Sequence, residues 1–208
     1  MPKTTSLRTR TDTHNDLCRE RILEVAEEHF RRIGYQKTSM ADIASCLGMS
    51  SANIYRFFPS RAAINKSICG RFFAQTAQSA DSIARRQAPA HEKLGDLLNV
   101  LHQKRKMTFI QEKPVHDLIV TAAEENWAII KAHGDEIVRI IETIVREGIE
   151  AGEFGVENAA QAARSVMNAF MPFYHPVLVE QRVRNGEDTE AGLRDQIRFF
   201  LKALGGAG

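Results

Sequence analysis

The sequence predicts an all-α protein, in which a small N-terminal three-helix unit is joined by a long fourth helix to a larger C-terminal helical unit. Apolar residues recur at spacings of three and four along most of the chain, as they do on one face of a helix. Glycines and prolines separate these segments at distances that suit helices. No segment alternates between apolar and polar residues with turn signals at its ends, so we expect no strand.

Composition restricts the class of protein. The 208 residues suit one large domain or two modest ones, and the 43% hydrophobic share permits a buried core. No run of 18 apolar residues occurs and the N-terminus lacks a secretory signal, so we expect neither a membrane-spanning helix nor export. Three scattered cysteines, without CxxC or HExxH spacing, favour a reducing compartment, the cytoplasm, over disulfides or a motif-encoded metal site.

Charge is distributed unevenly along the chain. Residues 1–70 contain 11 Lys and Arg against 7 Asp and Glu, whereas residues 71–208 contain 17 against 19. The N-terminal third therefore carries a surplus of positive charge on an otherwise slightly acidic protein. This pattern indicates that a polyanion binds the N-terminal part.

The first helix follows a polar start. Residues 1–18 carry Lys3, Arg8 and Arg10 and predict a flexible basic arm, which could reach a nucleic-acid groove or stay solvated. Helical periodicity begins after this arm. It stops at Gly34, as expected of a glycine that ends a helix.

Serines and a glycine mark the next three helices. Ser39, followed by Asp42, matches a capping box and predicts the start of a second short helix. Gly48 supplies the backbone freedom for a tight turn after it. Ser50 is expected to cap a third short helix and Ser60 a long fourth one.

The remainder of the chain is expected to be helical up to its last residues. The expected segments are Glu92–Gln111, Pro114–Lys131, Asp135–Gly152, 157–175 and, after a polar loop at 185–190, Ala191–Leu204. The expected domains are a flexible arm at 1–18, a helix-turn-helix domain at 19–66, a helical domain at 67–204 and a flexible tail at 205–208.

Two short helices that cross through a glycine turn form a helix-turn-helix motif. In the stretch SMADIASCLGMSSANIYRFF, Ile43, Leu47, Ile54 and Phe58 can pack inward. The opposite face of the third helix then carries Ser51, Ala52, Tyr55 and Arg56. Small residues let a helix approach base edges, and arginine and tyrosine can bind guanine or phosphate. The motif therefore predicts a recognition helix for DNA.

The same segment resembles the DNA-binding domain of the TetR/AcrR family of bacterial transcriptional regulators, and the match covers residues 22–61 closely. Shared features are Phe30, Gly34–Tyr35, Thr38–Ser39, Ala41–Gly48, Tyr55, Phe58 and Ser60–Arg61. Two positions depart from many members, which have glycine in place of Ala52 and lysine in place of Arg61. Neither change removes the capacity to bind DNA.

The resemblance implies a homodimer whose two recognition helices enter successive major grooves of a palindromic operator. Thr38 and Arg61 would contact phosphate, Ser51, Ala52, Tyr55 and Arg56 would face the groove, and Phe57 could lie against the DNA backbone. The full set of expected DNA contacts is Thr38, Ser39, Ser50, Ser51, Ala52, Asn53, Tyr55, Arg56, Phe57 and Arg61.

The resemblance also implies that the C-terminal domain binds a small-molecule effector and forms the dimer. Polar side chains among apolar ones suit a pocket that orients a ligand. The expected pocket residues are His116, Ile119, Ala123, Trp127, Met167, Phe170, Met171 and Tyr174. For the dimer we expect a four-helix interface from 156–174 and 191–204 of both subunits, packed through Ala159, Ala160, Ala163, Met167 and Phe170.

Other functions stay open at this point. His116, Asp117, His133 and His175 could converge on a divalent metal, which would suit a helical-bundle enzyme. A DNA-organising protein without an effector is a third possibility. No nucleophile motif supports catalysis, so we expect a non-enzymatic repressor that requires no cofactor.

Overall fold

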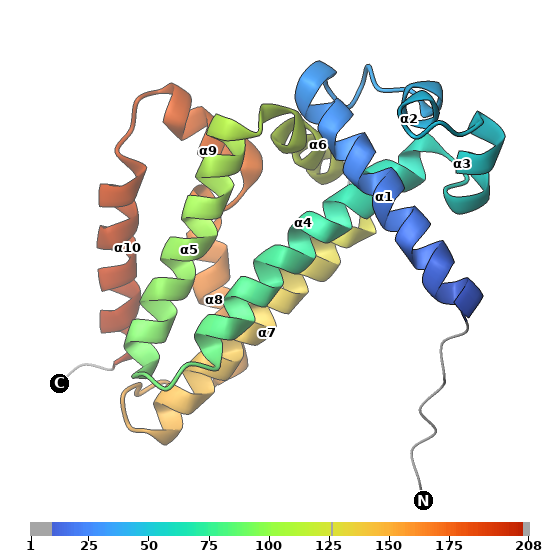
Figure 1. The fold of residues 1–208 in the computed structure, drawn as a ribbon. Helices are drawn as coiled ribbons and strands as arrows, with labels where there is room; N and C mark the ends of the chain where they lie inside the picture. Colours follow the sequence, from blue (N-terminus) through green and yellow to red (C-terminus); the bar gives the residue numbers. More distant parts are fainter. Residues whose placement is uncertain (1–9, 126, 206–208) are drawn as a thin grey trace, which may run out of the picture. The chain divides into compact units, whose positions relative to one another are not determined.

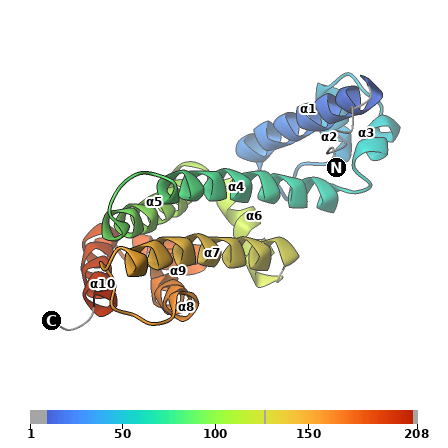
Figure 2. The same cartoon turned by 90° about the horizontal axis from the view of Figure 1, so that it is seen from below.

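The computed structural model describes residues 10–125 and 127–205, with side chains from His14 onward. The chain divides within its fourth helix into two compact units, residues 1–70 and 71–208. Helices are the only regular secondary structure in the described parts of both units (Figures 1 and 2), as predicted. No described helix is long and apolar enough to cross a membrane.

The first unit contains three helices and the start of a fourth. Its elements are α1 (Arg10–Ile33), α2 (Met40–Cys46), α3 (Ser51–Phe57) and the first part of α4 (Arg61–Ala84). Helix α1 packs against both α2 and α3, which also pack against each other. Ile22, Phe30, Ile43, Ile54 and Phe58 are almost fully buried and form the centre of this unit.

The side-chain caps that the sequence predicted at the starts of α2, α3 and α4 are present in the structure. The hydroxyl of Ser39 accepts from the backbone N–H of Asp42 at 3.1 Å, and Asp42 accepts from the N–H of Ser39 at 2.8 Å. Ser50 and Ser60 accept in the same way from residues three positions later, at 3.3 and 3.1 Å. Gly48 has a positive φ of 62°, which explains a glycine at this turn.

The expected arm over residues 1–18 is partly wrong. Helix α1 begins at Arg10, so the second half of that segment is the first part of a helix. The reason is that Thr, His and Asn are only weakly unfavourable in helices and do not stop one. Lys3 and Arg8 lie outside the described residues.

The capping box gives a stability prediction. We expect Ser39→Ala to lower the free energy of unfolding by about 1 kcal/mol, because two backbone N–H groups at the start of α2 lose or loosen their partners. Urea denaturation followed by circular dichroism measures the change. Ser45→Ala is the matched control, since Ser45 is exposed on the same helix. Equal midpoints for the two variants would contradict the prediction.

The second unit is formed by the rest of α4 and by six further α-helices and one 3₁₀ helix among the described residues. They are α5 (Ala90–Gln111), α6 (Lys113–Glu124), α7 (Ala128–Glu150), α8 (Ala159–Phe170), η1 (Met171–Phe173), α9 (Pro176–Arg184) and α10 (Thr189–Leu204). Helix α5 packs against α6, α7, α9 and α10, and α8 packs against α7 and α10. The hydrophobic core of the second unit contains Leu94, Leu98, Ile141, Phe170 and Phe200.

The expected boundaries around the connection between α6 and α7 are wrong. The segment expected to run from Pro114 to Lys131 ends at Glu124, and the next helix begins at Ala128 rather than Asp135. Trp127 is extended, and its backbone N–H donates to the carbonyl of Ala122 at 2.9 Å, which closes the end of α6. Gly134, expected to separate helices, lies inside α7, where its backbone is helical.

Helix α9 was not expected from the sequence. It begins at Pro176, a residue that suits the first turn of a helix because it has no N–H to satisfy there. Helix α10 begins two residues earlier than expected, since Asp188 accepts from the N–H of Ala191 at 2.9 Å. Of the tail, Gly205 is described and follows the end of α10.

Candidate nucleic-acid interface and ligand-binding core

The recognition helix α3 presents its polar face to solvent. Ile54 is fully buried under the helix, whereas Tyr55 is 50% exposed, and Ala52, Asn53 and Arg56 are exposed as well. The expected inward and outward faces of α3 are therefore present in the structure. Small residues at its N-terminal end and a tyrosine and an arginine near its C-terminal end form a surface suited to a major groove.

Arg19 on α1 fixes the far end of this helix, a role that the sequence did not indicate. Its guanidinium donates to the backbone carbonyl of Phe57 and lies 4.3 Å from the ring centroid of Phe58. A charged donor on the last carbonyls of a helix is favourable because of the helix dipole. Phe57 itself is half-buried. Arg19 thus holds the C-terminal end of α3 to α1.

Thr38 is not placed as expected. Its side chain is fully buried, and its hydroxyl donates to the carbonyl of Gly34 at 3.0 Å. The hydroxyl thus has a partner inside the unit, and a phosphate contact by Thr38 remains a prediction. Ser39 and Ser50 are exposed, but both hydroxyls accept from backbone N–H groups in their own helix caps. Their first role is to fix the helix starts.

Arg61, expected to bind phosphate, holds the connection between α1 and α2. Its guanidinium donates to the carbonyl of Gln36 at 2.8 Å and to that of Thr38 at 3.4 Å. The side chain remains exposed, so it can also reach an anion. A phosphate contact by Arg61 remains a prediction. The two hydrogen bonds to backbone carbonyls are a second reason for an arginine at this position, because a planar guanidinium can donate in several directions.

The expected effector residues lie in three different places. Met167, Phe170, Met171 and Tyr174 belong to the hydrophobic core of the second unit or pack against it. His116 and Ile119 are buried on α6, and Ala123 on the same helix is half-buried. Trp127 is half-buried at the α6–α7 connection, where its indole N–H donates to Glu125 at 2.7 Å.

Arg105 on α5, which the sequence did not single out, joins several of these residues. It is 4% exposed, and its Nε donates to the carbonyl of Tyr174 at 3.0 Å. Its guanidinium carbon lies 5.0 Å from the centroid of the Tyr174 ring and 5.5 Å from that of Phe72. A buried arginine beside aromatic rings is the signal that would have indicated this cluster, because arginine is rarely buried unless it is paired.

His133 on α7 belongs to the same cluster. Its Nε2 lies 2.5 Å from the hydroxyl of Tyr174, and its ring stacks on Phe73 with centroids 4.5 Å apart. Burial, and secondly the positive charge of Arg105, lower the pKa of His133 to about 4. The imidazole is therefore neutral at physiological pH.

This pKa gives a pH prediction. An unfolded histidine has a pKa near 6.5, so between about pH 6.5 and 4 the unfolded chain binds a proton that the folded His133 does not. Stability therefore falls as pH falls through this window, by at most about 1.4 kcal/mol per pH unit for this residue. Burial lowers the pKa of His102, His116 and His175 too, so they act in the same direction.

Urea unfolding at several pH values between about 7 and 5 tests this expectation, since the Glu190 carboxyl, with its pKa lowered to about 2, titrates only at lower pH. The variant His133→Phe keeps a ring on Phe73 and should show a smaller loss of stability over that range. An unchanged pH dependence in this variant would contradict the prediction.

The four residues considered for a metal do not form one site. Nε2 of His116 lies 2.8 Å from a carboxylate oxygen of Glu180, Asp117 pairs with Lys113, and His133 contacts Tyr174. Among residues 14–125 and 127–205, no group of three or more His, Cys, Asp or Glu is arranged to hold a metal ion. The hypothesis of a metal site built from His116, Asp117, His133 and His175 is therefore wrong.

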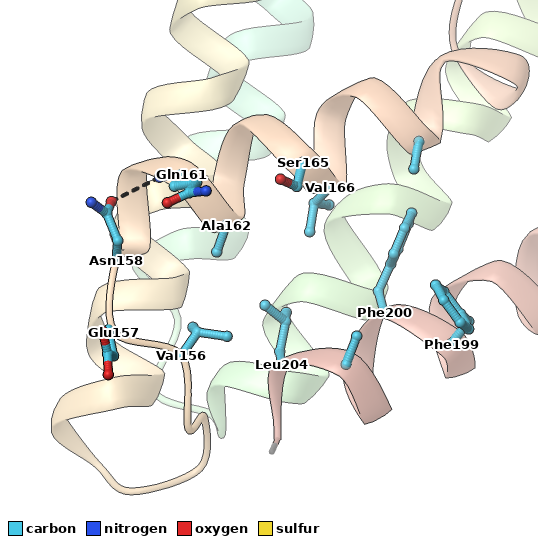
Figure 3. A pocket seen from close by; sticks show the side chains of 12 residues that line it. Val156, Glu157, Asn158, Gln161, Ala162, Ser165, Val166, Phe199, Phe200 and Leu204 are labelled. Carbon is cyan, nitrogen blue, oxygen red and sulfur yellow. Dashed lines mark hydrogen bonds between the residues drawn. The ribbon is translucent and has the colours of Figure 1, made fainter. Parts of the chain in front are cut away.

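Helices α8 and α10 border an open groove of about 530 Å³ (Figure 3). Ala162, Ser165 and Val166 contribute from α8, and Phe199 and Phe200 from α10. Phe199 is 64% exposed, an unusual state for a phenylalanine that lies beside other apolar groups. The groove is thus an apolar surface of the second unit on the two helices expected to form the dimer.

Three of the five residues expected to pack across the dimer lie inside one subunit. Ala163 and Phe170 are fully buried and Met167 is 8% exposed, and all three lie in the core of one subunit. Ala159 and Ala160 are half-buried. Alanines occur on several sides of α8, so the sequence alone did not determine which of them faces inward.

The geometry of the first unit is that of helix-turn-helix transcriptional regulators. Family profiles agree: the profile of bacterial regulatory proteins of the tetR family matches residues 22–68, and that of the tetracyclin repressor-like C-terminal domain matches residues 90–192. The chain belongs to the TetR family.

Relatives match almost the whole chain. An uncharacterized HTH-type transcriptional regulator, YfiR of Bacillus subtilis (strain 168), is 23% identical over 198 residues, which are 93% of this chain and 95% of that protein. A TetR/AcrR-family regulator from Thermobifida fusca has a TM-score of 0.65 and 22% identity, over 89% of this chain and 97% of its own.

Two similar structures contain ligands. The SmeT–triclosan complex has a TM-score of 0.66 and 19% identity, over 91% of this chain and 92% of its own. FadR from Bacillus subtilis in complex with stearoyl-CoA has a TM-score of 0.60 and 20% identity, over 89% of this chain and 98% of its own. These likenesses support the fold of both units.

Proposed function

We propose that the protein is a ligand-responsive transcriptional repressor, whose homodimer binds a palindromic operator and is released by a small molecule. The observation that carries this proposal is the exposed polar face of α3, with Tyr55 half-exposed above a fully buried Ile54. This face has no role in the packing of the unit, and its residue types suit base edges and phosphates.

On DNA, each part of this surface has a distinct task. The guanidinium of Arg56 can donate two hydrogen bonds to a guanine, and the ring of Tyr55 can contact a thymine methyl while its hydroxyl donates to phosphate. Ala52 is small enough to let the helix approach the bases. Arg19 and Arg61 act as positioning residues, because they hold the end of α3 and the α1–α2 connection.

For the dimer, we propose that the groove between α8 and α10 receives the same two helices of a second copy. A twofold interface is self-complementary, so an apolar groove flanked by the projecting Phe199 can accept its own counterpart. Burial of Phe199 and the alanines beside it would be favourable in proportion to the apolar area removed from water. Two recognition helices on one dimer would then read two half-sites about 34 Å apart, or a multiple of that distance.

For the response, we propose that an effector binds in the second unit near Arg105, His133 and Tyr174. The SmeT and FadR relatives bind triclosan and stearoyl-CoA, so a ligand in this fold is chemically reasonable. Helix α4 continues from the first unit into the second through Gly70. An effector that prefers one position of this helix by about 1–3 kcal/mol would suffice to weaken operator binding.

Selection of bound fragments from genomic DNA by the purified full-length protein tests the proposal. The selected fragments should share an inverted repeat, with half-site centres separated by one helical turn or a multiple of it. Fragments without any common repeat would contradict sequence-specific binding by a dimer. The same selection with Arg56→Ala should recover the motif weakly or with relaxed preference at one base position.

A further inference from the structure

Two cysteine–histidine pairs lie at one pocket of the first unit. Sγ of Cys46 lies 3.0 Å from Nε2 of His29, and Sγ of Cys18 lies 3.6 Å from Nε2 of His14. Both cysteines line a pocket of about 310 Å³ between α1 and the end of α2, together with Arg21, Ile22, Leu47 and Met49. A thiol within hydrogen-bond reach of an imidazole is the arrangement of a reactive nucleophile, and the proposed contacts with DNA use none of these residues.

The two histidines differ in burial. His29 is 6% exposed and its Nδ1 is buried without a hydrogen-bond partner, whereas His14 is exposed. Because an unpaired buried N–H is costly, the proton of the neutral His29 ring belongs on Nε2, which donates it to the sulfur of Cys46. Hydrogen bonds favour the thiolate, which is the form of a cysteine that attacks electrophiles. Cys46, whose side chain is exposed, is therefore the reactive thiol of this pocket.

Cys46 is the last residue of α2 and precedes the turn that leads into α3. Leu47 ends α2, and Met49, whose N–H donates to the carbonyl of Ala44 at 2.9 Å, comes directly before Ser50, the N-cap of α3. Leu47 and Met49 also line the pocket. A group bonded to Cys46 would occupy the same space and displace the turn that sets the start of α3.

The pocket suits a small electrophile that reacts with one thiol. Its volume is at the lower end of the range for ligand pockets, and Ile22, Leu47 and Met49 give it apolar walls. Cys18 lies about 16 Å from His29 along the axis of α1, at about 1.5 Å per residue. Since a disulfide requires α-carbons within about 7 Å of each other, a bond between Cys18 and Cys46 is not the expected product.

We propose that Cys46 is a modification site for α,β-unsaturated carbonyl compounds, and that the adduct releases the protein from its operator. The sulfur of Cys46 forms a bond with the β-carbon of the compound, and the electron pair of the C=C bond moves toward the carbonyl oxygen as an enolate. The α-carbon then takes up a proton in place of the one that the thiol lost, so no group leaves and no oxidant is consumed. The release step rests on the proposed function, whereas the addition to Cys46 does not.

The first test measures labelling of the full-length protein by methyl vinyl ketone at about pH 7, with peptide mass spectrometry after quenching by excess free thiol. Each cysteine is compared with itself in protein unfolded by urea, where the contact with His29 is lost. Cys46 should react at least about 3-fold faster in the folded protein, because one charge-assisted hydrogen bond outweighs the weaker nucleophilicity of a stabilised thiolate. Cys69, which is buried, should react more slowly in the folded protein.

Two histidine variants separate the effect of His29 from that of exposure. His29→Phe keeps a ring in the same place without an N–H, and the faster labelling of Cys46 should disappear. His14→Phe is the matched control, because His14 contacts the other thiol of the pocket, and it should keep the faster labelling. The comparison of folded and unfolded parent does not depend on the folding of either variant.

Anisotropy with the selected operator duplex measures release. Labelled parent should bind at least about 10-fold more weakly than untreated parent, within the range of coupling between two sites. Cys46→Ser should bind the operator as the parent does and keep its affinity after the same treatment. Ethyl methyl ketone, which has no C=C bond, should leave the affinity of the parent unchanged.

The proposal is overturned if Cys46 reacts no faster in the folded than in the unfolded protein, or if folded His29→Phe keeps the faster labelling. It is also overturned if parent labelled at Cys46 binds the operator with unchanged affinity. Untreated parent that binds operator and scrambled duplex equally would contradict the proposed function instead. The labelling rates are measured without DNA, so the two failures are distinguishable.

Discussion

Arg56→Ala is expected to weaken operator binding by 5- to 150-fold, about 1–3 kcal/mol, because a bidentate contact to a base edge is lost. Arg56 is exposed near the end of α3. The variant should therefore fold as the parent does. Tyr55→Phe isolates the second contact, since it removes the hydroxyl and keeps the ring.

Fluorescence anisotropy with a labelled operator duplex measures both variants. Arg31→Ala is the matched control, because Arg31 is an exposed arginine of the same unit that lies 3.8 Å from Glu27 on α1. It should bind within about twofold of the parent, as expected for a surface ion pair of small energy. If Arg56→Ala and Arg31→Ala bind equally, α3 is not the reading helix.

Phe199→Glu is expected to dissociate the dimer and to reduce operator affinity by about 10²- to 10⁴-fold, since the two half-sites then bind separately instead of as one linked pair. The carboxylate would be placed in an apolar groove that a second copy has to cover. Phe199 is 64% exposed in one subunit, so the substitution removes little packing from the monomer.

Sedimentation velocity and anisotropy on the same sample separate the two consequences. Lys202→Glu is the control, because it changes charge at an exposed position of α10 that does not line the groove. It should remain a dimer and bind operator. A Phe199→Glu protein that stays dimeric would show that the α8–α10 groove is not the interface.

The sequence predicted best those features that depend on neighbouring residues. The capping box of Ser39 and Asp42, the positive φ of Gly48 and the inward face of α3 are all local, because each is fixed within one or two helical turns. Their order along the chain also carried the resemblance to the TetR family, which the family profiles support.

Features that depend on tertiary contacts were predicted poorly. Thr38 has a residue type suited to phosphate, yet its hydroxyl donates to Gly34 across a turn. The α6–α7 break has no glycine or proline in the described residues Glu125 and Trp127, and it is closed by a backbone bond to Ala122. Arg105 carries no motif, and its significance appears only once folding brings Tyr174 and Phe72 beside it.

The most direct test of the account is anisotropy of full-length protein with the selected operator duplex and a scrambled duplex, at several salt concentrations. We predict binding of the operator at least about 10³-fold tighter than binding of the scrambled duplex, with an affinity that falls steeply as salt rises. Equal affinity for both duplexes over the whole salt range would contradict sequence-specific recognition by α3, and with it the proposed repressor.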